Sequence, residues 1–152
     1  MGARTKSGEQ PMNRILNISD ASSLGLHAVV YLAREPGGVA TAHEIAACLK
    51  ASEAHLSKVL QSLVRAGIVR STRGPHGGFS LDCDPDRVSL LDVYEAVQGK
   101  LERTDCLFPT RVCGDSPCIF GDLLSSMSEK LRDHLSSTKL TQVNDTFMEV
   151  CA

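Results

Sequence analysis

Apolar side chains recur at intervals of three and four residues over much of the chain, a spacing that predicts amphipathic helices. The first helix is expected to begin at Ser19 or Asp20, because short polar side chains cap helix N-termini. It should end before Pro36, which interrupts the pattern. Its apolar side is formed by Leu24, Ala28, Tyr31 and Leu32.

Two short helices with a tight break between them are predicted next. Thr41 and Glu44 match a capping box, so a helix opens there and runs to about Leu49. Ser52 then caps a third helix, which Gly67 ends. Two helices joined in this way are typical of a helix-turn-helix, whose second helix lies in the DNA major groove. The apolar stripe of the third helix comprises Leu56, Val59, Leu60, Leu63 and Val64.

A β-hairpin is predicted directly after the third helix. Residues 68–73 and 79–81 have strand patterns, and the Gly-Pro-His-Gly-Gly sequence at 74–78 predicts the turn between them. A hairpin in this position is the wing of a winged helix. The expected fold class is therefore mainly α with a small β-hairpin wing.

Two further helices flank a segment without periodicity. Ser89 is expected to cap a helix through Gln98, and a long helix is predicted from about Phe120 to Ser137. The residues between them hold three cysteines and show neither a helical nor a strand period. The long helix carries its apolar side chains on one face, at Phe120, Leu124, Met127, Leu131 and Leu135.

Composition indicates a folded chain, since 42% of the residues are hydrophobic and 22% are charged. No apolar run approaches the ~18 residues of a membrane span, and the polar first 13 residues do not match a secretory signal. We therefore expect a cytoplasmic protein with no membrane partner. Because thiols stay reduced in the cytoplasm, the six cysteines favour metal binding or redox sensing over a disulfide framework.

The formal net charge of −2 conceals an asymmetry along the chain. Residues 14–80 contain 7 Lys and Arg against 4 Asp and Glu, whereas residues 81–152 contain 7 against 13. Phosphate binding needs only a local basic face, which the first half can provide. The charge distribution therefore permits DNA binding without demonstrating it.

Polar side chains suited to DNA contacts occur on the third helix and at the hairpin tip. Arg73 is the strongest single candidate, because an arginine among glycines can reach a phosphate or a narrow minor groove. An ordinary solvated helix face remains the alternative for any one position on the helix. The helix, turn, helix and wing together predict double-stranded DNA as the partner. The candidate DNA-binding residues are His55, Ser57, Lys58, Gln61, Arg73 and His76.

Three cysteines form a candidate metal site. Cys106, Cys113 and Cys118 are separated by six and four residues in a segment containing glycine and proline. Thiolates are the usual protein ligands of iron–sulfur clusters, and a loop can wrap around such a cluster. Three thiolates leave one position of a cubane cluster for another ligand, and incomplete ligation makes iron accessible to nitric oxide or oxygen. This pattern suits a sensor.

Other interpretations of the cysteines remain open. Structural zinc usually shows closer cysteine spacing and a fourth Cys or His nearby, neither of which is present. The three thiols are otherwise reversible oxidation sensors or incidental. Cys48 is expected in the core, and Cys83 and Cys151 are expected to take no part.

An enzyme or electron carrier is the alternative of another class. The sequence shows no phosphate-binding loop and no evident pairing of a nucleophile with a base, so neither catalysis nor a small-molecule substrate is expected. A small electron carrier has no use for a wing.

The chain resembles one bacterial family at three places. Residues 25–33 (GLHAVVYLA), 55–60 (HLSKVL) and 73–79 (RGPHGGF) look like the winged-helix repressors that include the iron–sulfur cluster regulator (IscR), the nitric-oxide-sensitive repressor (NsrR) and the cysteine metabolism repressor (CymR). The resemblance runs from about Ile15 to Val143, and the wing motif is its most specific part. It implies a homodimer whose long C-terminal helices cross, and which offers two winged helices to a palindromic operator.

The resemblance also implies a cofactor, a 2Fe-2S or 4Fe-4S cluster with Cys106, Cys113 and Cys118 as ligands. The family's spacing is closer to five and five, or four and five, than to the six and four found here. Gly121 stands where some members have a ligating histidine, and Ser23 stands where others have an aspartate that reaches the partner's cluster. Asp20 is the nearest substitute for that aspartate.

These observations predict a sequence-specific transcriptional repressor with DNA affinity controlled by a cluster that responds to redox state, nitric oxide or iron–sulfur status. The alternative is a clusterless regulator of the same fold, controlled by cysteine thiol oxidation or by a protein or small-molecule partner. The expected organisation is a flexible extension (1–13), a winged helix-turn-helix domain (14–99), a cysteine-containing sensor loop (100–119), a dimerisation helix (120–138) and a C-terminal tail (139–152).

Overall fold

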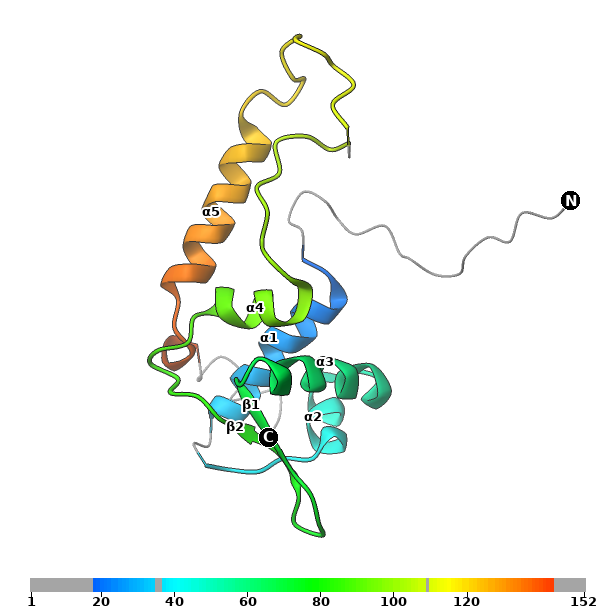
Figure 1. Cartoon of the computed structure of the whole chain (residues 1–152), viewed down its shortest axis with the longest axis vertical. Helices are drawn as coiled ribbons and strands as arrows, with labels where there is room; N and C mark the ends of the chain where they lie inside the picture. The colour runs from blue at the N-terminus through cyan, green and yellow to red at the C-terminus, as the bar shows by residue number, and fades with distance from the viewer. Residues whose placement is uncertain (1–17, 35–36, 109, 144–152) are drawn as a thin grey trace, which may run out of the picture.

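The computed structural model describes residues 18–34, 37–108 and 110–143, which form five α-helices, a 3-10 helix and one two-stranded sheet (Figure 1). This architecture confirms the predicted fold class. The predicted extension at 1–13, residues 144–152 of the predicted tail and Cys151 lie outside the described residues. In chain order the elements are α1 (Asp20–Ala33), α2 (Ala42–Leu49), α3 (Glu53–Arg65), β1 (Val69–Thr72), β2 (Gly78–Leu81), α4 (Leu90–Gln98), α5 (Leu123–Ser137) and η1 (Leu140–Gln142).

Side-chain caps fix where the first four helices begin. Ser19, Thr41, Ser52 and Ser89 each accept a hydrogen bond from a backbone amide of the following turn, as the sequence predicts. In α2 the Glu44 carboxylate accepts from the Thr41 amide at 2.7 Å, which completes the capping box. The same hydrogen bond lowers the pKa of Glu44 below its ordinary value.

The wing pairs with the segment that precedes α2. Strands β1 and β2 are antiparallel, with Val69 opposite Leu81 and Thr72 opposite Gly78. Phe79 and Ala40 exchange backbone hydrogen bonds of 2.7 and 2.9 Å. A side chain at Gly78 would place its Cβ 2.6 Å from the Ala40 carbonyl oxygen, so glycine allows this close approach. The wing is thereby fixed to the helical domain.

The main core lies between α1 and α3. Leu56, Leu60 and Leu63 are fully buried on one side of α3, as their spacing predicts, and they pack in one cluster with Ala28 and Val29 of α1. This cluster holds α3 in position while leaving its opposite face to solvent.

Helix α5 begins three residues later than the sequence predicts. Gly121 has a φ of 56° and Asp122 has non-helical backbone angles, so Phe120 precedes the helix and is not part of its apolar face. Of the expected apolar positions, Leu124 and Leu135 are buried, whereas Met127 and Leu131 are half-buried. Only part of the predicted stripe is therefore covered within the described chain.

The chain after α5 returns to the core. Leu140 is fully buried in the main cluster, and its amide donates to the Val88 carbonyl at 3.2 Å. The Leu90 amide donates to the Thr138 carbonyl at 3.0 Å, so the end of α5 is attached to the start of α4. The first residues of the predicted tail are thus a structural part of the domain.

The overall shape separates two ends of the molecule. Figure 1 shows α5 rising away from the helical domain, with the chain before it at one end and the wing at the other. Among the described residues, no helix combines the length and the apolar character that a membrane crossing requires.

Candidate nucleic-acid interface and cysteine loop

The exposed face of α3, which the sequence predicts to be the recognition helix, carries Lys58, Gln61 and Arg65. These residues are three and four positions apart, so they project from one side of the helix. Ser57 is half-buried beside them, and Arg65 donates to Ser62 Oγ at 2.8 Å. Arg65 is not among the six candidate DNA-binding residues named from the sequence, and its exposed position beside Gln61 adds it to the candidates.

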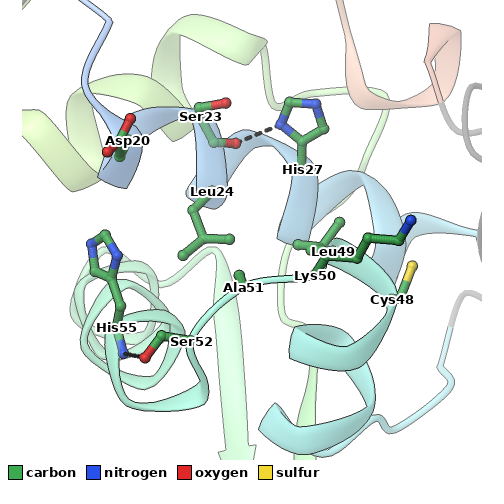
Figure 2. Close-up of a pocket in the computed structure, with 10 residues that line it drawn as sticks. All are labelled: Asp20, Ser23, Leu24, His27, Cys48, Leu49, Lys50, Ala51, Ser52 and His55. Carbon is green, nitrogen blue, oxygen red and sulfur yellow. Dashed lines mark hydrogen bonds between the residues drawn. The ribbon is translucent and has the colours of Figure 1, made fainter.

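His55 lies apart from that exposed row, in a groove between α1 and the turn of the helix-turn-helix (Figure 2). Asp20 and His27 of α1 line the same groove, which has a volume of about 580 Å³. His27 Nδ1 lies 2.6 Å from the Ser23 carbonyl oxygen. Asp20, the predicted fourth cluster ligand, is thus placed beside the recognition helix.

The wing tip exposes the two side chains that the sequence assigns to DNA. Arg73 and His76 are both exposed. Gly77 follows His76 and precedes β2. The turn is so tight here that a Cβ on Gly77 would lie 2.2 Å from the Thr72 carbonyl oxygen. The glycine therefore keeps the tip narrow, and a narrow tip can enter a groove of DNA.

A side-chain hydrogen bond joins α2 to the start of α3. His43 Nδ1 lies 3.2 Å from Glu53 Oε2, and both side chains are largely exposed. A solvent-exposed pair contributes little to the free energy of folding. Its position places a carboxylate in the first turn of the recognition helix.

Residues 106–118, here called the cysteine loop, hold three free thiols. Cys106 and Cys118 are half-buried and Cys113 is exposed. The Phe120 amide donates to Cys118 Sγ at 3.4 Å, and the Gly121 amide donates to the Cys118 carbonyl at 2.9 Å. The backbone that leads into α5 therefore orients one of the three sulfur atoms.

The described residues do not gather these thiols into a metal site. No group of three or more His, Cys, Asp or Glu side chains among them is arranged to hold a metal ion. Asp20 lines the groove beside α1 rather than the cysteine loop. The donor type fits an iron–sulfur cluster, since three free thiols share one loop without regular secondary structure. Ligation would require the loop to close around the cluster.

The remaining described cysteines differ from those of the loop. Cys48 is half-buried rather than in the core, contrary to the expectation from the sequence. Cys83 is a half-buried free thiol. Burial, reinforced by the negative charges of Asp82 and Asp84, raises the pKa of Cys83 above its ordinary value. A raised pKa reduces the fraction of the Cys83 thiol that is present as reactive thiolate.

Large apolar side chains are exposed on and beside the cysteine loop. Ile119 is 91% exposed, and Val112, Phe108 and Leu123 are each more than half exposed. Almost all the large exposed apolar side chains of the described residues lie in this part of the chain, the exception being Val39. An apolar concentration of this kind is typical of a surface that a partner covers.

Comparisons with known proteins agree on one family. A family model described as "Rrf2: Iron-dependent Transcriptional regulator" matches residues 18–146. A putative HTH-type transcriptional regulator of Aquifex aeolicus is 30% identical over 125 residues, 80% of this chain and 87% of that protein. The HTH-type transcriptional regulator IscR of Vibrio vulnificus is 29% identical over 60% of this chain and 55% of its own.

A solved structure extends the likeness to the whole described fold. The global cysteine regulator CymR of B. subtilis has a TM-score of 0.69 and 27% identity, and the match covers 85% of this chain and 96% of that one. The match therefore spans most of both chains.

Proposed function

Because the chain belongs to the Rrf2 family of transcriptional regulators, which bind DNA and are not enzymes, we propose that it represses transcription as a homodimer on a palindromic operator. Its DNA affinity is set by an iron–sulfur cluster held by Cys106, Cys113 and Cys118. The observation that carries this proposal is the joining, in one chain, of an exposed helix-and-wing surface to a loop with three free thiols.

The exposed apolar residues support the homodimer. Leu123 at the start of α5 and Ile119 beside it are exposed, and Leu131 on the same helix is only half-buried. A second copy that packs α5 against α5 buries these side chains on both chains at once, as two-fold symmetry requires. Two copies also present two recognition helices, which is why a palindromic operator is expected.

The residues around the thiols support the cluster. When bound, an iron–sulfur cluster supplies a group that reacts with oxygen and nitric oxide. In this chain the Phe120 amide orients the Cys118 sulfur through a 3.4 Å hydrogen bond. Asp20 of the partner subunit is the proposed fourth ligand, because Asp20 is exposed and lies away from the cysteines of its own chain.

Anaerobic purification tests the cluster. We expect a brown protein with visible absorption that contains iron and acid-labile sulfide, and that loses its colour on titration with nitric oxide. Replacing Cys106, Cys113 and Cys118 by alanine should abolish the colour, whereas Cys83→Ala should retain it as the matched control. A colourless, iron-free protein under these conditions contradicts the proposed cofactor.

Selection from a random double-stranded DNA library tests the operator. The enriched sites should be palindromic, and the complex should contain two protein chains per site. Replacing Arg73 by alanine should weaken binding and reduce the slope of log K against log [salt] by about 0.9, the value for one phosphate contact. Lys130→Ala removes the same charge from an exposed position on α5 and should leave that slope unchanged. If the slope of log K against log [salt] is the same for both variants, Arg73 does not contact a DNA phosphate.

Thiol control without a cluster is the second candidate. The exposed free thiol of Cys113 favours it. In that case the iron-free protein binds DNA, and a mild oxidant changes its affinity. The Cys113→Ser variant loses this response. Iron and sulfide analysis separates the two candidates.

A further inference from the structure

A polar contact joins the start of α1 to the end of α4. Gln98 is the last residue of α4, and its Oε1 accepts hydrogen bonds from Ser19 Oγ at 2.7 Å, from Ser19 N at 3.2 Å and from Ser22 Oγ. Ser22 is fully buried, so its hydroxyl depends on protein partners. We call these three residues the Gln98 junction.

On one side, the Gln98 junction borders the segment that leads to the cysteine loop. Gly99 ends α4, and Leu101, which is 3% exposed, donates its amide to Glu95 Oε1 at 3.1 Å. The Leu101 carbonyl accepts from Arg132 of α5. The Thr104 amide donates to Ser128 Oγ, also of α5, at 2.9 Å. The chain between α4 and Cys106 is therefore fastened to both helices.

On the other side, α1 is in direct contact with the recognition helix. A Cβ built on Gly25 would lie 2.7 Å from Val97 Cγ2 of α4 and 3.3 Å from Val59 Cγ1 of α3. Helix α1 therefore contacts α3 and α4 directly at Gly25, where α1 has no side chain to separate its backbone from them. Packed interiors transmit displacement because they have little free volume, so a shift of α1 moves α3.

We propose that Gln98 is a positioning residue that couples the cysteine-loop side of the molecule to the recognition helix through α1. Hydrogen bonds from Ser19 and Ser22 to one Gln98 oxygen hold the start of α1 to the end of α4, where an apolar contact would tolerate sliding. A displacement of the segment after Gly99 then moves α1 and α3 as one body. This inference rests on the proposed function for the identity of the signal, whereas the coupling itself can be tested without that signal.

A double-mutant cycle on DNA affinity tests the coupling. Arg132→Ala removes the hydrogen bond to the Leu101 carbonyl and should loosen the attachment of this segment to α5 without altering any cysteine. In the otherwise unchanged protein we expect it to alter the Kd for the selected DNA site by between about twofold and about thirtyfold. In a Gln98→Met background, where the acceptor oxygen is gone, the same Arg132→Ala change should leave Kd unchanged. Gln98→Glu keeps acceptor oxygens and should restore the response.

Matched controls separate coupling from stability and charge. Lys130→Ala removes one positive charge from α5, as Arg132→Ala does, and it should not alter Kd in either background. Thermal unfolding identifies any variant that does not fold. If Gln98→Met fails to fold because the Ser22 hydroxyl loses its acceptor, the paired Ser22→Ala and Gln98→Met variant removes the hydroxyl as well.

Each outcome decides the question. An Arg132→Ala effect of equal size in the unchanged protein and in the Gln98→Met background overturns the proposal, as does the absence of any effect in the unchanged protein. A failure of the proposed function appears differently. In that case, replacing all three loop cysteines leaves DNA affinity unchanged, while the Arg132→Ala response and its dependence on Gln98 persist.

Discussion

At the scale of single residues, the solvent exposure of each cysteine says more about its reactivity than the spacing of the cysteines along the chain does. The sequence assigns Cys106, Cys113 and Cys118 to one site because they lie in one loop. Their burial differs, since Cys113 is exposed and the other two are half-buried. No periodic pattern in the sequence shows this difference, because the residues around the three cysteines form neither a helix nor a strand whose buried face could be predicted.

Alkylation rates should follow these environments. In the iron-free, reduced protein at neutral pH, we expect Cys83 to react several-fold more slowly than Cys113. Burial and two adjacent aspartates raise the pKa of Cys83 and so reduce its reactive thiolate. Mass spectrometry of iodoacetamide-treated peptides over time gives both rates. Equal rates would mean that the Cys83 thiol is accessible to solvent.

At the scale of elements, helix starts were predictable and the start of α5 was not. Ser19, Thr41, Ser52 and Ser89 act through hydrogen bonds within one turn, so local sequence contains the whole signal. Helix α5 has no side-chain cap hydrogen bond at its N-terminus. Its first turn is set instead by the positive φ of Gly121, which a periodic apolar pattern does not show.

The cap of α4 should make stability depend on pH. The Ser89 hydroxyl donates to Asp92 at 2.7 Å, and this hydrogen bond, with that of the Ser89 amide, lowers the pKa of Asp92. A lowered pKa in the folded state stabilises the fold above the unfolded pKa of about 4. This contribution is lost as pH falls through the folded value.

Acid titration of the unfolding free energy checks the sign. Between pH values of about 5 and 3, the Asp92→Asn variant should lose less stability than the unchanged protein does. Ser89→Ala should cost about 1 kcal/mol at neutral pH, as loss of an N-cap does. When Ser89 is already replaced by alanine, Asp92→Asn should have a smaller effect on the pH dependence of the unfolding free energy. A pH dependence that Asp92→Asn leaves unchanged contradicts the role of the carboxylate.

At the scale of the whole molecule, residues far apart in sequence complete one core. Leu140 lies fully buried beside residues of α1, α3 and α4, although the sequence predicts a tail there. A single leucine after a long helix carries no periodic signal of its own. The winged helix was predictable because its parts are consecutive, whereas the return of the chain to the core after α5 is a non-local contact.

Truncating the Leu140 side chain should measure how much its burial contributes to the stability of the fold. Leu140→Ala is expected to reduce the free energy of unfolding by about 2–5 kcal/mol, the usual cost of a cavity at a buried leucine. Leu123→Ala is the matched control, because Leu123 is 51% exposed and its truncation should cost much less. Chemical denaturation monitored by circular dichroism gives both values. A small loss at Leu140 would mean that the segment after α5 is dispensable to the fold.

The burial of Leu140 also implies that the core is completed only late in synthesis of the chain. The helix-turn-helix and wing leave the ribosome well before residue 140, but their core is completed only when that leucine and the Val88 hydrogen bond are added. An unfinished chain therefore contains every candidate DNA-binding residue without the packing that holds these residues in place. Prematurely terminated products should be removed by proteases rather than occupy operators as defective competitors.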